Sequence, residues 1–495
     1  MMKKTVLLLT PIFLLAAQTD IDSKIEKLQE EIKLLKEEVK YHQEDLDERI
    51  PIIESVEKKS ILDKINLSPE LRLRFDKYKY KNGIIGNTPD YENTQVYDPT
   101  GNPTGSRRDE FTKDYDLATS FRFRLNMNME IENVKFIGRL LYMNSTQSHQ
   151  RICILSRDIK TGTAGSAFDV DRAYVDYALN KQSPYAFTFS FGLLPTTGGT
   201  PMQYAQDNKR SALFPALVFD MNTYGMIGTQ KLGTNSYARL VLAKPYTLRP
   251  NFYPYQCNRE NIDNANIVGL YSDTQFNFLG KSLLSFGVNM LHDLKAHPYL
   301  GPDIDPSASH TLGEMITFGL GIDIEKFVDT DTTFFIHTAL SNPHGNGEEE
   351  DYRISATNIY GAPQTLADGL TETGNPGFTE ADYASGPMLK KDGYAYYIGV
   401  KYEMNEAVNI GAEFNYGSKY WFSATQGAED MFNKLAIRGE AYEMYATWKY
   451  QKYFSTKISY LYTHEDYTGS GWHFGTPVSK DATQNIASVT LEAKF

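Results

Sequence analysis

Charged side chains recur at every second position of several short segments, and they are the residues of this sequence best suited to chemistry. Basic residues occupy these positions early in the chain, and acidic residues occupy them late. The basic set is Arg72, Arg74, Arg122, Arg124, Lys135, Arg139, Arg172 and Arg239, and the acidic set is Asp323, Glu403, Glu413 and Glu443. Fixed charges along a water-filled path govern which ions pass. We predict that a basic wall faces an acidic wall across such a path. The alternative is that these charges only neutralise one another.

Catalytic, metal-binding and nucleotide-binding patterns find little support. The nine histidines show no metal-ligand spacing, and His292 and His297 lie five positions apart. The sequence TTGGT at 196–200 is not followed by the Gly-Lys-Ser/Thr of a phosphate-binding loop. We expect no catalytic residue, no metal and no cofactor. The net charge of −12 argues against a nucleic-acid partner.

The charges lie on segments of strict alternation. In LATSFRFRLNMNME, apolar side chains from Leu117 to Met129 share one face, while Arg122 and Arg124 lie on the other. A period of two is typical of a β-strand with one apolar face. We predict sixteen strands, near residues 67–78, 117–129, 133–143, 169–179, 185–194, 223–230, 235–244, 266–278, 282–291, 313–325, 331–340, 393–404, 407–417, 438–450, 453–463 and 485–495.

The connections between these strands alternate between short and long. An even number of strands of about ten residues, with short turns at one end and long loops at the other, is typical of a membrane β-barrel. We therefore predict an all-β fold, a transmembrane antiparallel β-barrel of about 16 strands over residues 67–495. A soluble β-sandwich would also alternate, but we would expect turns of mixed length and fewer charges at its strand centres.

The last predicted strand ends on Phe495, in the sequence NIASVTLEAKF. A barrel closes only when its last strand pairs with its first, because an open edge in lipid leaves backbone groups unsatisfied. We expect this strand to pair with 67–78 and its apolar face to contact lipid. A terminal aromatic residue on an alternating strand resembles the signal that the bacterial outer-membrane assembly machinery recognises. The resemblance implies this role for Phe495, with the C-terminus in the periplasm.

The N-terminal region contains two different patterns. Two lysines, an apolar run and small residues predict a secretory signal peptide over residues 1–17. Apolar residues then recur among charged neighbours with heptad spacing, at Ile25, Leu28, Ile32, Leu35, Val39 and Leu46. This spacing predicts a periplasmic coiled coil, with its linker, in residues 18–66, and the residue types alone favour two helices. A single amphipathic helix lying on the barrel is the alternative.

The stretch FSFGLLPTTGGTPMQYAQDNKRSALFPALVFDMNTYGMIGT, residues 189–229, resembles part of a porin-like family of bacterial outer-membrane proteins of unknown function. Members have a signal peptide, a short coiled coil and a β-barrel, and the layout resembles 16-stranded general porins. The resemblance implies a non-enzymatic, water-filled channel for passive diffusion of small hydrophilic solutes or ions. It also implies a homotrimer in contact with outer-membrane lipid and lipopolysaccharide. The alternative is a structural envelope protein that tethers the outer membrane to the cell wall through its coil.

The third long connection, residues 195–222, corresponds to the loop that commonly folds inward and narrows the channel of porins. Its charged residues are Asp207, Lys209, Arg210 and Asp220. By this resemblance we expect it to be a constriction loop, with a solvent-exposed loop as the alternative. Cys153 and Cys257 fall in two other long loops, and whether they pair is left open.

Overall fold

The computed structural model describes residues 24–45, 47, 50, 64–82, 95–97, 103–106, 111–145, 166–245, 265–296, 310–345, 353–355, 383–385, 391–425, 433–467 and 479–495. The predicted signal peptide, Cys153 and Cys257 lie outside these residues. The chain forms two compact units, Met1–Ile65 and Asn66–Phe495, which are described separately.

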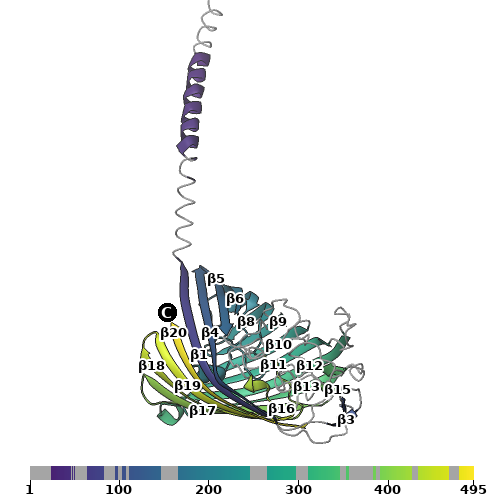
Figure 1. Ribbon diagram of the computed structural model, residues 1–495. Helices are drawn as coiled ribbons and strands as arrows, with labels where there is room; N and C mark the ends of the chain where they lie inside the picture. The colour runs from purple at the N-terminus through teal and green to yellow at the C-terminus, as the bar shows by residue number, and fades with distance from the viewer. Residues whose placement is uncertain are drawn as a thin grey trace, which may run out of the picture. The chain divides into compact units, whose positions relative to one another are not determined.

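A helix over residues 24–45 dominates the described part of the first unit (Figure 1). The five predicted heptad positions within this helix, from Ile25 to Val39, are exposed, with Ile32 at 52 % and Val39 at 61 %, whereas Leu46 lies outside the described residues. An apolar stripe of this kind is stabilised when it packs against another helix. The helix is confirmed, whereas its assembly into a coiled coil stays a prediction. None of the described helices is both long enough and apolar enough to span a membrane.

Sixteen antiparallel strands of the second unit close into one barrel. They are β1 (Ile65–Asn82), β4 (Phe111–Ile131), β5 (Val134–Ser145), β6 (Ser166–Leu179), β7 (Phe187–Leu194), β8 (Thr223–Leu232), β9 (Ser236–Pro245), β10 (Asn266–Asn277), β11 (Lys281–Ala296), β12 (His310–Glu325), β13 (Thr332–Gly345), β16 (Gly393–Glu403), β17 (Val408–Gly417), β18 (Gly439–Gln451), β19 (Phe454–Tyr467) and β20 (Ser479–Lys494). The fold and all sixteen predicted strands are confirmed, as is the alternation of short and long connections. The sequence did not predict two small hairpins within long connections, β2 (Gln95–Tyr97) with β3 (Pro103–Ser106), and β14 (Arg353–Ser355) with β15 (Tyr383–Ser385).

The barrel closes between its first and last strands, β1 and β20, which lie side by side in Figure 1. Phe75 pairs with Val489 and Leu73 with Leu491, so the apolar faces of the two strands coincide. At the end of the chain, the Phe495 N–H donates to the Pro69 carbonyl at 3.1 Å. The Phe495 ring stacks on Tyr453 with a centroid distance of 5.3 Å. The last residue is therefore held by backbone pairing and by an aromatic contact.

The outer face of the barrel is apolar. Large side chains that alternate along the strands stay exposed there, among them Leu270, Leu340, Met444 and Ile458. Aromatic rings gather near both ends of β16–β18, with Tyr396 stacked on Tyr416 near the long loops and Trp448 against Tyr450 near the short turns. An apolar band between aromatic girdles is the lipid-facing surface of a transmembrane barrel.

An apolar core lies inside the barrel. Two connections between strands contribute to it: residues 195–222, termed the inward segment, and residues 418–425 with 433–438, termed the second inward segment. Phe214, Phe219 and Trp421 are completely buried there. The two segments meet where the Asp220 N–H donates to the Ala424 carbonyl at 2.9 Å. The inward segment lies inside the barrel, and the second inward segment was not anticipated from the sequence.

The inner wall of β8–β16 supplies the other half of this core. Tyr204 stacks on Phe335 of β13 with a centroid distance of 5.4 Å, and Phe214 packs on Tyr271 of β10 at 4.5 Å. The Phe335 ring packs against Gly399 of β16, where an added Cβ would come within 2.2 Å of its Cζ atom. Complete burial of such side chains stabilises the fold by about 1.5–3 kcal/mol each. The core therefore fills the lumen beside these strands except near their short-turn ends.

Candidate functional site

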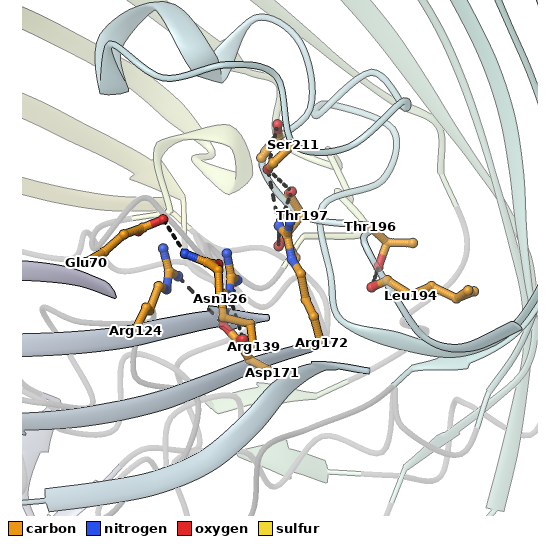
Figure 2. A network of polar contacts seen from close by, with 11 residues as sticks. Glu70, Arg124, Asn126, Arg139, Asp171, Arg172, Leu194, Thr196, Thr197 and Ser211 are labelled. Atoms are coloured by element: carbon orange, nitrogen blue, oxygen red, sulfur yellow. Dashed lines mark hydrogen bonds and ion pairs between the residues drawn. The ribbon is translucent and has the colours of Figure 1, made fainter. Parts of the chain in front are cut away.

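On the basic side of the interior, two arginines share one carboxylate. Arg139 of β5 donates two hydrogen bonds to Asp171 of β6, at 2.6 Å to each carboxylate oxygen. Arg124 of β4 lies 3.8 Å from the same carboxylate (Figure 2). All three side chains are buried. A carboxylate that the sequence did not predict therefore neutralises part of the basic wall.

A β-bulge explains why Asp171 was missed. Arg139 pairs with Arg172, but the next residue, Leu140, pairs with Val170, so Asp171 is the extra residue on β6. A bulge places two successive residues opposite one, which breaks the period of two. Arg172 and Asp171 consequently both contact interior groups, although they are neighbours in the sequence.

Arg172 fastens the inward segment to the wall. Its guanidinium donates to the Thr197 carbonyl and to the Ser211 hydroxyl, both at 3.2 Å (Figure 2). At this bulge, Asp171 therefore binds Arg139 and Arg124, while Arg172 holds the inward segment. Lys135 lies nearer the short turn, half-buried and opposite Asp176 in the strand register.

A second basic group lies at the closing seam. Arg122 of β4 is 3.7 Å from Glu492 of β20, and Arg72 of β1 pairs with Glu492 in register. Lys494 reaches the same carboxylate at 2.7 Å. Arg74 of β1 contacts Asp76 at 2.9 Å. The predicted basic residues on these two strands thus lie close together in the interior.

Farther around the wall, one carboxylate binds both the wall and the inward segment. Asp273 of β10 contacts Arg239 of β9 at 3.3 Å and Arg210 of the inward segment at 2.8 Å. Arg239 and Asp273 are buried. Arg210, predicted as a constriction residue, is therefore an anchor of the inward segment, whereas Lys209 beside it is exposed.

The predicted acidic wall contains lysines as well. Glu413 of β17 lies 2.5 Å from Lys434, which belongs to η9 (Lys434–Ala436) in the second inward segment. Lys434 also contacts Glu443 of β18, and Lys457 of β19 reaches Glu443 at 3.0 Å. Lys434 lies in the connection between the predicted strands 407–417 and 438–450, so the alternation along strands did not identify it. The two walls are therefore mixed in sign.

The remaining two acidic residues have different surroundings. Asp323 of β12 is buried, hydrogen-bonded to His337 at 2.7 Å and to the Thr200 hydroxyl of the inward segment. Glu403, in contrast, lies beside a short turn with a side chain that is 60 % exposed, 3.7 Å from Lys401. Glu403 therefore belongs to the barrel mouth and Asp323 to the buried anchors.

Two aspartates fix the inward segment, one in its middle and one near its end. Asp207, just after α3 (Met202–Gln206), contacts Lys401 of β16 at 2.7 Å and Lys449 of β18 at 2.6 Å. Burial acts to raise the pKa of Asp207, but the two lysines outweigh it and hold that pKa below its usual range. Asp220 is fully buried and accepts a hydrogen bond from the Gly198 N–H at 2.7 Å. The four predicted constriction residues therefore include three that hold the segment in place.

Helix α3 separates two cavities. A smaller one of about 100 Å³ is lined by Met202, Ala205 and Gln206 of this helix together with β1, β4 and β18–β20. A larger one of about 860 Å³ is lined by Gln203, Tyr204 and the wall from β9 to β16. Arg72, Arg74, Arg122 and Glu443 line the smaller cavity, and Lys209, Arg210, Asp323 and Glu403 line the larger. Space for water and solute therefore remains on both sides of α3.

Several solved structures are similar to this chain. One is OprB of Pseudomonas putida, which has 8% identity and a TM-score of 0.43, with 88% of this chain and 96% of that one covered. OmpF of Salmonella typhi, in complex with daunomycin, has 11% identity and a TM-score of 0.43, covering 87% and 97%. The outer membrane channel DcaP of Acinetobacter baumannii has 12% identity and a TM-score of 0.42, also covering 87% and 97%. No curated protein matches the chain. Residues 112–493, from β4 to β20, match the family described as a protein of unknown function, DUF3373, and the chain belongs to this family.

Proposed function

We propose that this protein is an outer-membrane porin, a water-filled channel for passive diffusion of small hydrophilic solutes or ions. The observation that carries the proposal is the charged and hydroxyl-rich lining of the smaller cavity beside α3, inside a closed sixteen-stranded barrel. Barrels of this size leave an aqueous path unless they are plugged. A barrel that served only as an anchor for a tether would need no charged lining.

The inward segment would set the width of this path. It is tied to the wall through Arg172, Asp273, Asp323, Lys401 and Lys449. It fills the side next to β8–β16 except near the short turns, where the larger cavity lies. Solutes would therefore move along the opposite side, past β1, β4 and β18–β20. Arg72, Arg74, Arg122 and Glu443 would line this path, while Arg124, Arg139 and Asp171 would support it from the wall.

The orientation follows from the connections. Barrels of this type have short turns on the periplasmic side and longer loops outside the cell. β1 begins and β20 ends at the short-turn side, so the helical region before β1 and Phe495 would face the periplasm. Residues 1–17 would act as the secretion signal, and Phe495 would be read by the assembly machinery. Outer-membrane lipid and lipopolysaccharide would surround the apolar face.

A homotrimer is the proposed assembly. The exposed stripe at Ile25, Leu28, Ile32, Leu35 and Val39 supports self-association, because packing against other copies would cover it. The resemblance of the sequence to 16-stranded general porins supports three copies. Three short heptads are marginal alone, so barrel contacts would decide the number of subunits.

The test is a planar-bilayer recording of the purified full-length protein under a salt gradient. Stepwise ohmic conductance is expected, with a reversal potential that gives the ion preference. A complete lack of conductance from folded, membrane-inserted protein would refute the channel and leave the tether.

A further inference from the structure

The smaller cavity has a marked excess of positive charge. Nine charged side chains line it, six basic and three acidic. The basic ones are Arg72, Arg74, Arg122, Lys434, Lys457 and Lys494, and the acidic ones are Asp207, Glu443 and Glu492. The whole chain, in contrast, carries a net charge of −12. The excess is therefore a local property of this cavity.

The cavity also offers hydroxyl donors. Serine and threonine side chains line it on the strands that face α3, at Thr447, Ser455, Ser459 and Thr490, while the hydroxyl of Ser488 beside them donates to Asp76. Hydroxyl groups donate hydrogen bonds to oxygen atoms without adding charge. Arginine guanidinium groups present five donors in a planar fork that matches carboxylate and phosphate oxygens. The lining therefore combines the two kinds of donor that oxyanions require.

Glu492 gathers cations on one side of the smaller cavity. This carboxylate lies 3.7 Å from Arg122 and 2.7 Å from Lys494, and it pairs in register with Arg72. Three cations therefore share one carboxylate here, which contributes to the positive excess of the lining.

We propose that the smaller cavity is a saturable binding site for small multivalent oxyanions, which chemically means phosphates or dicarboxylates. This inference rests on the proposed function, since it identifies the solute class that the channel would favour. The volume of about 100 Å³ fits a small anion with a few water molecules. A multivalent anion offsets more of the local excess than chloride does, and a site shielded from bulk water is screened less by salt.

The experiment records chloride current through the full-length protein in a planar bilayer while inorganic phosphate is added, at a pH where the dianion dominates. The current should fall saturably as phosphate occupies the site. In the Arg72→Gln/Arg122→Gln variant, the half-blocking concentration should rise at least about tenfold, because each arginine contributes charge-assisted hydrogen bonds. The control is Lys281→Gln/Lys326→Gln, which removes the same two charges from the larger cavity. Its half-blocking concentration should stay within about twofold of wild type.

Two results would overturn the inference: a current that falls linearly with phosphate without saturation, or an equal effect of the two variants. Should the arginine variant fail to assemble, Lys494→Gln near the barrel end replaces it, with a smaller rise expected. Repeating the titration with succinate, a dicarboxylate, shows whether the site prefers phosphate or dicarboxylate ligands. Block by both ligands supports a general oxyanion site, and block by one assigns that class.

Calorimetric titration of detergent-extracted protein with phosphate separates this inference from the proposed function. Saturable heat without conductance in any salt would refute the channel and support the site. Ohmic conductance without block and without heat would refute the site and support the channel.

Discussion

The pair Arg139–Asp171 should be among the strongest polar contributions to barrel stability. Both hydrogen bonds measure 2.6 Å, and the two side chains are only 9% and 5% exposed. Breaking a buried pair by removing one partner typically costs about 3–5 kcal/mol, because the other charge stays buried. Arg124, at 3.8 Å, still attracts Asp171 when Arg139 is replaced. We therefore expect the lower end, about 3 kcal/mol of unfolding free energy, for Arg139→Met.

A double-mutant cycle measures the interaction itself. Asp171→Asn should also destabilise the barrel, since it leaves Arg139 and Arg124 buried side by side. The double variant should be about 2 kcal/mol more stable than the sum of the single losses predicts, because neither charge remains alone. Unfolding by guanidinium in a detergent or thin-bilayer system, followed by tryptophan fluorescence, supplies the free energies. Trp421 is fully buried within the barrel and should report its opening.

The matched control is Lys181–Glu130, a pair with a similar distance of 3.0 Å but exposed side chains. Its cycle should show no coupling beyond experimental error, as for most surface pairs. Additive losses at Arg139 and Asp171, or equal coupling in the two cycles, would refute the assignment of a buried bidentate pair.

Four further predictions concern the lumen, the chain end and assembly. Arg122→Gln should shift the reversal potential toward cations, because it removes fixed positive charge from the smaller cavity; an unchanged potential would place Arg122 off the conducting path. Lys401 and Lys449 lower the pKa of Asp207 in the folded protein. The contact of the Asp207 carboxylate with these lysines therefore contributes fully to stability above about pH 4, the usual pKa of an aspartate. This contribution is lost as the pH falls through the lower pKa of the folded state. Asp207→Asn should therefore raise conductance at neutral pH, and a conductance equal to wild type would show that the anchor does not control the width. Deletion of Phe495 should lower the amount of heat-modifiable barrel in the outer membrane, since it removes the stacking on Tyr453, and normal levels would contradict its role. Cross-linking of detergent-extracted protein should give a ladder that ends at three, and a ladder that ends at two would favour the heptad pattern instead.

The strands were predictable because lipid and water impose a simple rule on each of them. Outward residues must be apolar and inward residues of a wet lumen are polar, so the period of two is visible without any partner strand. Residues 117–129 obey this rule, and they lie within β4 (Phe111–Ile131). Pairing was predictable between strands joined by short turns, and also at the seam, because closure requires β1 to meet β20.

The interior was less predictable, because it depends on contacts between distant residues. Asp171 enters the lumen through a bulge, and Lys434 enters on a connection that has no periodic pattern. The sequence does contain one local signal for the apolar core inside the barrel. Phe334–Phe335 and Tyr396–Tyr397 put large rings on both faces of β13 and β16. A strand that is apolar on both faces is covered on both, and here the second cover is the inward segment.

The two interpretations of the charges that the sequence left open would apply to different parts of the lumen. Beside the inward segment, charged side chains hold the segment to the wall: Asp273 contacts Arg239 and Arg210, and Asp323 forms hydrogen bonds with His337 and Thr200. Each contact between a carboxylate and an arginine weakens the field of both groups beyond a few ångströms. Near β1, β4 and β20, one carboxylate, Glu492, is shared among several cations, and six basic and three acidic side chains line the smaller cavity. On the proposed function, the first group would mainly anchor the inward segment and the second would select ions, with α3 between the two cavities.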